Sequence, residues 1–362
     1  MRMPLCDRRD FLSSFGGLAV ASMLARDGWS SEKAAGGVLH HPAKAKRVVQ
    51  LFMSGAASHV DLWDYKPRLA ELHGKPVPEE YVAGKRFSTM TGKADGKLML
   101  QPVEPFAQHG RSGAWVSRFM PFTAAIADRL CFIKSMHTEA VNHAPGITFL
   151  LTGSEMPGRP SLGAWLSYGL GVETQELPGY VVMTSISKDT TCGQIFYDFY
   201  WGSGFLPTRY SGVKFRGSGE PVLYLNNPDG MSPQVRRGLL DDLAQLNEMK
   251  LREFGDPEIA TRIAQYEMAF RMQTSVPGLM DITREPANIL DLYGCKPGDG
   301  TFASNCLLAR RLAERGVRFI QLYHRDWDHH GSVKEHVRGT AAEVDQPIAA
   351  LMKDLKQRDM LK

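Results

Sequence analysis

The chain has 362 residues, of which 43% are hydrophobic, and a formal net charge of +4. These values predict a globular protein with a sizeable core, because disordered chains have fewer apolar residues and more net charge. No apolar run reaches the roughly 18 residues that a membrane span requires. The chain has no dense tract of Lys and Arg and only five cysteines, so we expect neither a nucleic-acid partner nor a disulfide scaffold.

The N-terminal stretch has the layout of an export signal. Paired Arg8 and Arg9 precede a Phe-Leu pair and a weakly apolar run rich in Gly, Ala and Ser, a pattern typical of twin-arginine signals. We expect residues 1–25 to be this signal peptide, residues 26–45 a linker and residues 46–362 the folded domain. The protein would then be exported to the periplasm or the extracellular space. A surface helix is the alternative for the N-terminal stretch.

Short apolar runs bounded by turn residues predict buried strands. They lie at 47–53, 130–135, 180–183, 222–225 and 317–323. Helical patterns lie at 145–151, 160–168, 233–272, 301–315 and 334–361, and Gly316 is well placed to end the fourth of these helices. Strands that alternate with helices predict an α/β fold with a mostly parallel sheet.

Imidazole and carboxylate groups gather after three of the predicted strands. Because parallel strands place their carboxyl ends at one edge of the sheet, we expect these groups to lie together. Such groups suit Zn²⁺ or another divalent ion, while the alternative is that they only solvate the loops. The groups are His59, Asp61 and Asp64; His137, Glu139, Asn142 and His143; and His324, Asp326, Asp328, His329 and His330.

Other common chemistries lack their motifs. The chain has no G-x-S-x-G, no G-x-x-x-x-G-K-[ST] and no C-x-x-C. These absences disfavour an α/β-hydrolase, a phosphate-loop nucleotide site and thiol redox chemistry.

Four stretches together resemble an exported bacterial family, numbered 1501 among the domains of unknown function. They read LFMSGAASHVDLWDYKP, IKSMHTEAVNHAPGITFLLTGS, PGRPSLGAWLSYGLG and WDHH. The family is similar to the alkaline phosphatase and sulfatase superfamily. The resemblance implies a three-layer α/β/α fold of the alkaline-phosphatase type with a mostly parallel sheet. Relatives continue beyond the last helix with a strand and further ligands, so we expect this chain to be incomplete at its C-terminus.

The resemblance also implies roles for particular residues. His143 stands in register with the nucleophilic Cys of the sulfatase motif, and it could act as nucleophile, general base or metal ligand. The sulfatase Arg position is Ile147. A bound anion would be favoured by the start of the helix, and His137 and Asn142 are expected to bind substrate. The alternative for His143 is a residue that caps the helix or packs the loop.

The expected metal ligands are Asp328 and His330, with Asp61 reaching back from the turn after the first strand. Asp326 and His329 are alternatives in the third loop, and Asp61 could instead serve as a cap. These residues predict a metal-dependent hydrolase of phosphate or sulfate esters, with Zn, Ca or Mg as the divalent metal and a small anionic ester as substrate. A non-catalytic binding or scaffold protein on the same fold is the alternative.

Overall fold

The computed structural model describes residues 44–87, 96–188, 196–223 and 225–361. The chain divides into two units, residues 1–46 and residues 47–362, and almost all of the described residues belong to the second. The predicted signal peptide lies outside the described residues, as do residues 26–43 of the predicted linker.

Four strands form one sheet in the order β1-β6-β4-β5, and all neighbouring strands are parallel. The strands are β1 (Val48–Met53), β4 (Tyr180–Ile186), β5 (Val213–Phe215) and β6 (Phe319–Arg325). His324 of β6 lies opposite both Met53 of β1 and Ser185 of β4. The carboxyl ends of these three strands therefore meet at one edge, which confirms the predicted parallel sheet.

The other elements are helices and one hairpin. The hairpin pairs β2 (Phe106–His109) with β3 (Ala114–Ser117) in antiparallel fashion. The α-helices are α2 (His59–Leu62), α3 (Arg68–Leu72), α4 (Pro121–Ala124), α5 (His143–Thr152), α6 (Leu162–Leu170), α7 (Pro233–Phe254), α8 (Pro257–Met280), α9 (Ala287–Tyr293), α10 (Phe302–Glu314) and α11 (Val333–Gln357). Short 3₁₀ turns lie at η1 (Glu79–Tyr81), η2 (Ala127–Arg129), η3 (Asp198–Trp201) and η4 (Thr208–Tyr210).

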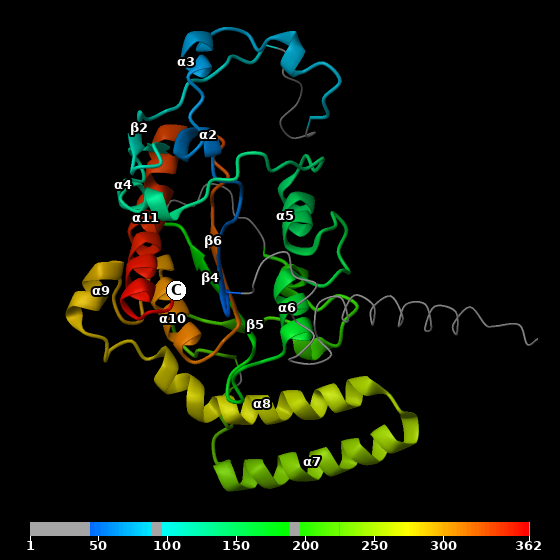
Figure 1. Ribbon diagram of the computed structural model, residues 1–362. Coiled ribbons are helices and arrows are strands. Elements are labelled where there is room, and N and C mark those ends of the chain that lie inside the picture. Colours follow the sequence, from blue (N-terminus) through cyan, green and yellow to red (C-terminus); the bar gives the residue numbers. More distant parts are fainter. Residues whose placement is uncertain (1–43, 88–95, 189–195, 224, 362) are drawn as a thin grey trace, which may run out of the picture. The chain divides into compact units, whose positions relative to one another are not determined.

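Helices cover both faces of the sheet. Successive side chains of a strand point to opposite faces, and in β6 Ile320 and Leu322 join one buried cluster while Phe319 and Tyr323 join another. The first cluster contains the buried face of α10 and α11, and the second contains residues of α5. Figure 1 shows α10 and α11 on one side of the strands and α5 and α6 on the other. Two covered faces explain why the central strands carry apolar side chains toward both faces.

Two predicted strands are wrong. Residues 130–135 form a loop in which Ile133 is 66% exposed, and the described residues of 222–225 form a turn. An apolar run shows the same pattern whether or not it finds a pairing partner. The fourth strand of the sheet is instead β5, which at three residues is too short to stand out in the sequence.

The long helix predicted over 233–272 is two helices. Gly255 adopts a left-handed conformation with φ 66°, and its N–H bonds to the carbonyl of Leu251, which ends α7. Asp256 then accepts a hydrogen bond from the N–H of Glu258 and caps the start of α8. The two helices pack against each other as a hairpin (Figure 1).

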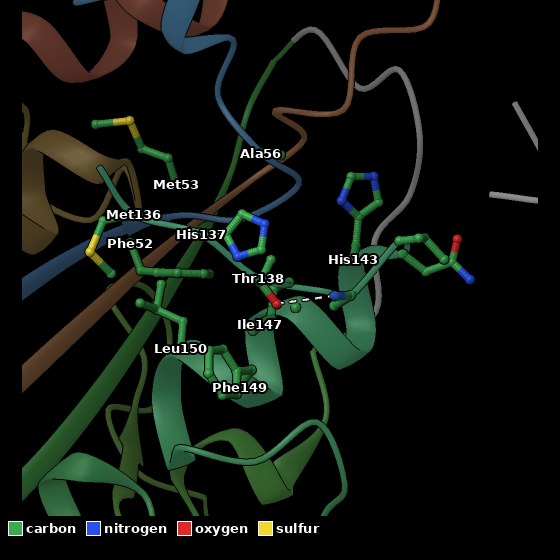
Figure 2. Close-up of a pocket in the computed structure, with 14 residues that line it drawn as sticks. Phe52, Met53, Ala56, Met136, His137, Thr138, His143, Ile147, Phe149 and Leu150 are labelled. Carbon is green, nitrogen blue, oxygen red and sulfur yellow. Dashed lines mark hydrogen bonds between the residues drawn. The ribbon is translucent and has the colours of Figure 1, made fainter. Parts of the chain in front are cut away.

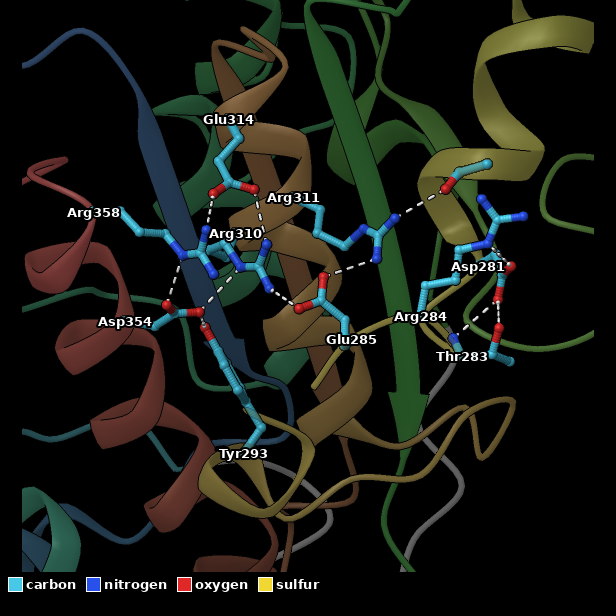
Figure 3. A network of polar contacts seen from close by, with 11 residues as sticks. Asp281, Thr283, Arg284, Glu285, Tyr293, Arg310, Arg311, Glu314, Asp354 and Arg358 are labelled. Atoms are coloured by element: carbon cyan, nitrogen blue, oxygen red, sulfur yellow. Dashed lines mark hydrogen bonds and ion pairs between the residues drawn. The ribbon is translucent and has the colours of Figure 1, made fainter. Parts of the chain in front are cut away.

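A buried charged cluster joins α10 to α11 (Figure 3). Arg310 is 3% exposed and contacts Glu285 at 2.7 Å, Glu314 at 2.8 Å and Asp354 at 3.0 Å. Tyr293 donates its hydroxyl proton to Asp354. Burial alone would lower the pKa of Arg310, but its hydrogen bonds to Glu285 and Glu314 raise that pKa above its ordinary value. The guanidinium is thus fully charged and depends on its carboxylate partners.

We expect Asp354→Ala to lower the free energy of unfolding by about 3–5 kcal/mol, because it leaves the buried Arg310 charge short of a partner. Urea unfolding measures this. The control is Glu248→Ala, which removes a carboxylate from an exposed ion pair with Arg252 at 4.0 Å and should change stability little. Equal stability of the two variants would contradict the role given to the cluster.

Candidate functional site

The loops that follow β1 and β6 are joined by backbone hydrogen bonds. The N–H of Ser54 donates to the carbonyl of His324 at 2.9 Å, and the N–H of Trp327 donates to the carbonyl of Ser54 at 3.1 Å. Gly55 and Ala56 then turn the chain with φ values of 107° and 69°. These bonds hold the start of the loop after β6 at the carboxyl edge of the sheet, immediately before Asp328.

Asp328 contacts two imidazoles, one with each carboxylate oxygen. Its Oδ2 lies 3.0 Å from Nε2 of His143, and its Oδ1 lies 2.8 Å from Nε2 of His330. The side chain of Asp328 is 15% exposed, against 41% for His143 and 57% for His330. The predicted proximity of His143 and Asp328 is therefore confirmed. Hydrogen bonds to an ionised carboxylate are among the stronger ones in proteins.

His143 is the first residue of α5. Asn142 before it is extended, and the carbonyl of Asn142 accepts the N–H of Gly146 in the first helical bond. The first turn of α5 carries no acidic side chain. The partial positive charge of the helix start therefore lies beside the imidazole of His143 and favours a bound anion.

A cavity of about 590 Å³ opens beside His143 (Figure 2). His143 lines the cavity, whereas Asp328 does not. His137 and Asn142 also line it, so the structure brings these two predicted substrate-binding residues together with His143. The rest of the lining is mainly apolar: Phe52, Met53, Ala56, Met136, Ala140, Val141, Gly146, Ile147, Phe149 and Leu150, with Thr138.

Asp61 lies in α2 and has partners in the segments around that helix. Its Oδ2 accepts a hydrogen bond from the hydroxyl of Ser58 at 2.5 Å, and its Oδ1 accepts one from the N–H of Val103 at 2.8 Å. The side chain is buried. Both oxygens of Asp61 therefore join the segments around α2, while the start of that helix has no side-chain cap. Nearby Asp64 pairs with Lys66 at 2.7 Å and with Lys134 at 3.5 Å.

The remaining metal-ligand candidates lie deeper in the loop after β6 or on the surface. Asp326 is fully buried, with Oδ2 3.3 Å from Nε of Arg325. The ring of His329 stacks on that of His336 at 5.9 Å. Within the described ranges, no three His, Cys, Asp or Glu side chains form a group that could hold a metal ion. His330 and Asp328 are the most closely placed of the predicted ligands.

A second polar group at the same edge joins the predicted His324 to two residues that were not predicted, Ser185 and Glu343. Nδ1 of buried His324 lies 2.9 Å from the hydroxyl of Ser185, and its Nε2 lies 3.0 Å from Glu343. Burial alone would raise the pKa of Glu343, but bonds from His324 and from the N–H of Lys188 hold that pKa below its ordinary value. The group ties β4, β6 and α11 together below the Asp328 loop. Its partners sit inside a strand and a helix, where the sequence pattern carries no sign of them.

The fold and the site define an α/β protein with a pocket at the carboxyl edge of a parallel sheet. A family model described as "Protein of unknown function (DUF1501)" matches residues 45–362, and the chain belongs to this family. Neither a curated protein nor a solved structure gave a significant match. Among the described residues, no helix has the length and apolar character needed to cross a membrane.

Proposed function

We propose that the protein is a hydrolase of phosphate or sulfate esters on an alkaline-phosphatase-like fold, with His143 as its catalytic residue. The observation that carries this proposal is that His143 lies between the partly exposed carboxylate of Asp328 and the cavity. Its Nε2 contacts Asp328 at 3.0 Å while the residue lines the cavity at the start of α5. The order carboxylate, imidazole, pocket is the arrangement that general acid–base and nucleophilic catalysis require.

Asp328 sets the chemistry of the imidazole. A carboxylate accepts a hydrogen bond from Nε2–H and so favours the tautomer with the proton on Nε2, which leaves the lone pair on Nδ1 to act as base or nucleophile. As base, Nδ1 takes a proton from water, the water oxygen bonds to phosphorus or sulfur, and the ester oxygen leaves and takes the proton. Asp328 stabilises the imidazolium formed in between, and the start of α5 stabilises the anionic group.

A divalent metal, expected from the resemblance, would take Asp328 and His330 as ligands. A metal acts as a Lewis acid on such esters. The described residues offer this ion no group of three ligands, so the arrangement does not fit a resident metal well. No step of the reaction above depends on one.

Hydrolysis of aryl phosphates and aryl sulfates by the full chain tests the proposal. We expect His143→Gln to lower kcat/KM by about 10²–10⁴, the usual share of a general base, and Asp328→Asn to lower it as well. The control is His109→Gln, on β2 and outside the pocket lining. Turnover by His143→Gln at the rate of the control would contradict the assignment.

A non-catalytic binding protein is the second candidate. Two observations favour it: Ile147 occupies the position of the sulfatase Arg, and the described residues lack a three-ligand group. Ligand binding to the pocket with no turnover by the wild-type chain would select this candidate.

We also propose that residues 1–25, outside the described residues, direct export by the twin-arginine route. Changing both Arg8 and Arg9 to Lys should retain the precursor in the cytoplasm, because this route reads the arginine pair. Cell fractionation with an antibody against the chain measures this. Normal export of the double variant would contradict the route.

A further inference from the structure

The only titratable side chains that line the cavity beside His143, among the described residues, are the imidazoles of His137 and His143. Among the described residues that line it, none is Lys, Arg, Asp or Glu. Large apolar side chains also stand exposed around it: Met136 is 68% exposed, Leu150 52% and Phe149 41%. In Figure 2 the apolar side chains of Met53 and Met136 lie across the view from the imidazole of His143.

Such walls are poorly suited to a sugar sulfate or another polyhydroxylated ester. Each hydroxyl placed against an apolar wall loses water without gaining a hydrogen bond, and this costs free energy. An alkyl or aryl group gains free energy in the same place, because both surfaces leave water. The volume of about 590 Å³ is within the range of small-molecule pockets.

We propose that the substrate is a monoester of an alkyl or aryl alcohol, whose apolar group fills the cavity while its anionic group meets His143. This inference rests on the proposed function and names the substrate class of the same site. The anionic group would lie at the start of α5, and the apolar group would extend along α5 toward Leu150, which also lines the cavity. From His143 to Leu150 the helix rises about 10 Å, which sets the length of apolar group that the cavity can cover.

The affinity of n-alkyl phosphonates for the full chain tests the proposal, because these anions cannot be hydrolysed. Isothermal titration calorimetry should show binding that tightens about fourfold for each added methylene, as full burial of a methylene predicts. The gain should stop once the chain exceeds about 10 Å. A sugar sulfate should bind at least tenfold more weakly than the longest of these. Affinity that does not depend on chain length, or equal affinity for the sugar sulfate, would overturn the proposal.

A matched pair of variants locates the effect. Leu150→Asn should lose much of the dependence on chain length, whereas Leu170→Asn should keep it. Leu170 is 50% exposed, close to the 52% of Leu150, but it lies on α6 and does not line the cavity. If both variants lost the dependence on chain length equally, or if neither variant lost it, the apolar group would lie elsewhere and the proposal would be overturned.

His143→Gln separates this inference from the proposed function. The variant should bind the phosphonates with an unchanged dependence on chain length and yet lose turnover. If turnover depended on His143 but the affinity for phosphonates did not depend on chain length, only the substrate class would be overturned. Dependence on chain length in a wild-type chain without turnover would overturn the hydrolase and leave the apolar ligand class standing.

Discussion

One carboxylate organises the candidate site. Asp328 holds His143 with one oxygen and His330 with the other. His143 belongs to α5, which covers one face of the sheet, whereas Asp328 follows the central strand β6. The Asp328–His143 contact therefore joins the start of α5 to the sheet edge, while Ile147 and Leu151 pack the rest of α5 in one cluster with β6. Without it, the imidazole would be free to turn away from the cavity, since its side chain is 41% exposed.

The position of Asp328 depends in turn on the buried edge of the sheet. Backbone bonds between Ser54 and residues 324 and 327 join the loops after β1 and β6. Below them, His324 is held by Ser185 and Glu343. Buried polar groups of this kind are stable only when they are paired, so the edge has little freedom to rearrange. A rigid edge that carries a partly exposed imidazole is a suitable scaffold for a reactive site.

The sequence predicted the parts of this site that depend on strand order. Parallel strands bring their carboxyl ends together, which places Asp328 after β6 correctly. His143 was expected at the same edge because its loop follows the predicted strand at 130–135, so its proximity to Asp328 is confirmed although that reason for it is wrong. The run at 130–135 was wrongly predicted as a strand, because apolar periodicity does not reveal whether a pairing partner exists. Even so, the loop that it forms carries His137 to the cavity.

The sequence could not reveal which side chains pair. Asp61 lies in the predicted loop, but its partners Ser58 and Val103 are set by the fold around α2. Ser185 and Glu343 carry no motif, and they reach His324 only because β4 and α11 pack against β6. The buried Arg310 cluster was missed for the same reason, since charged residues in a helix normally indicate a solvated face.

Nε2 of His143 lies 3.0 Å from Asp328, and proton NMR of the imidazole ring tests most directly whether Nε2 donates a hydrogen bond to this carboxylate. In the full chain at neutral pH, we expect the proton of His143 to reside on Nε2, with a downfield resonance typical of a bond to a carboxylate. Asp328→Asn should abolish the downfield shift, and His330→Gln should leave it in place. A proton on Nδ1, or a resonance indifferent to Asp328→Asn, would contradict the account.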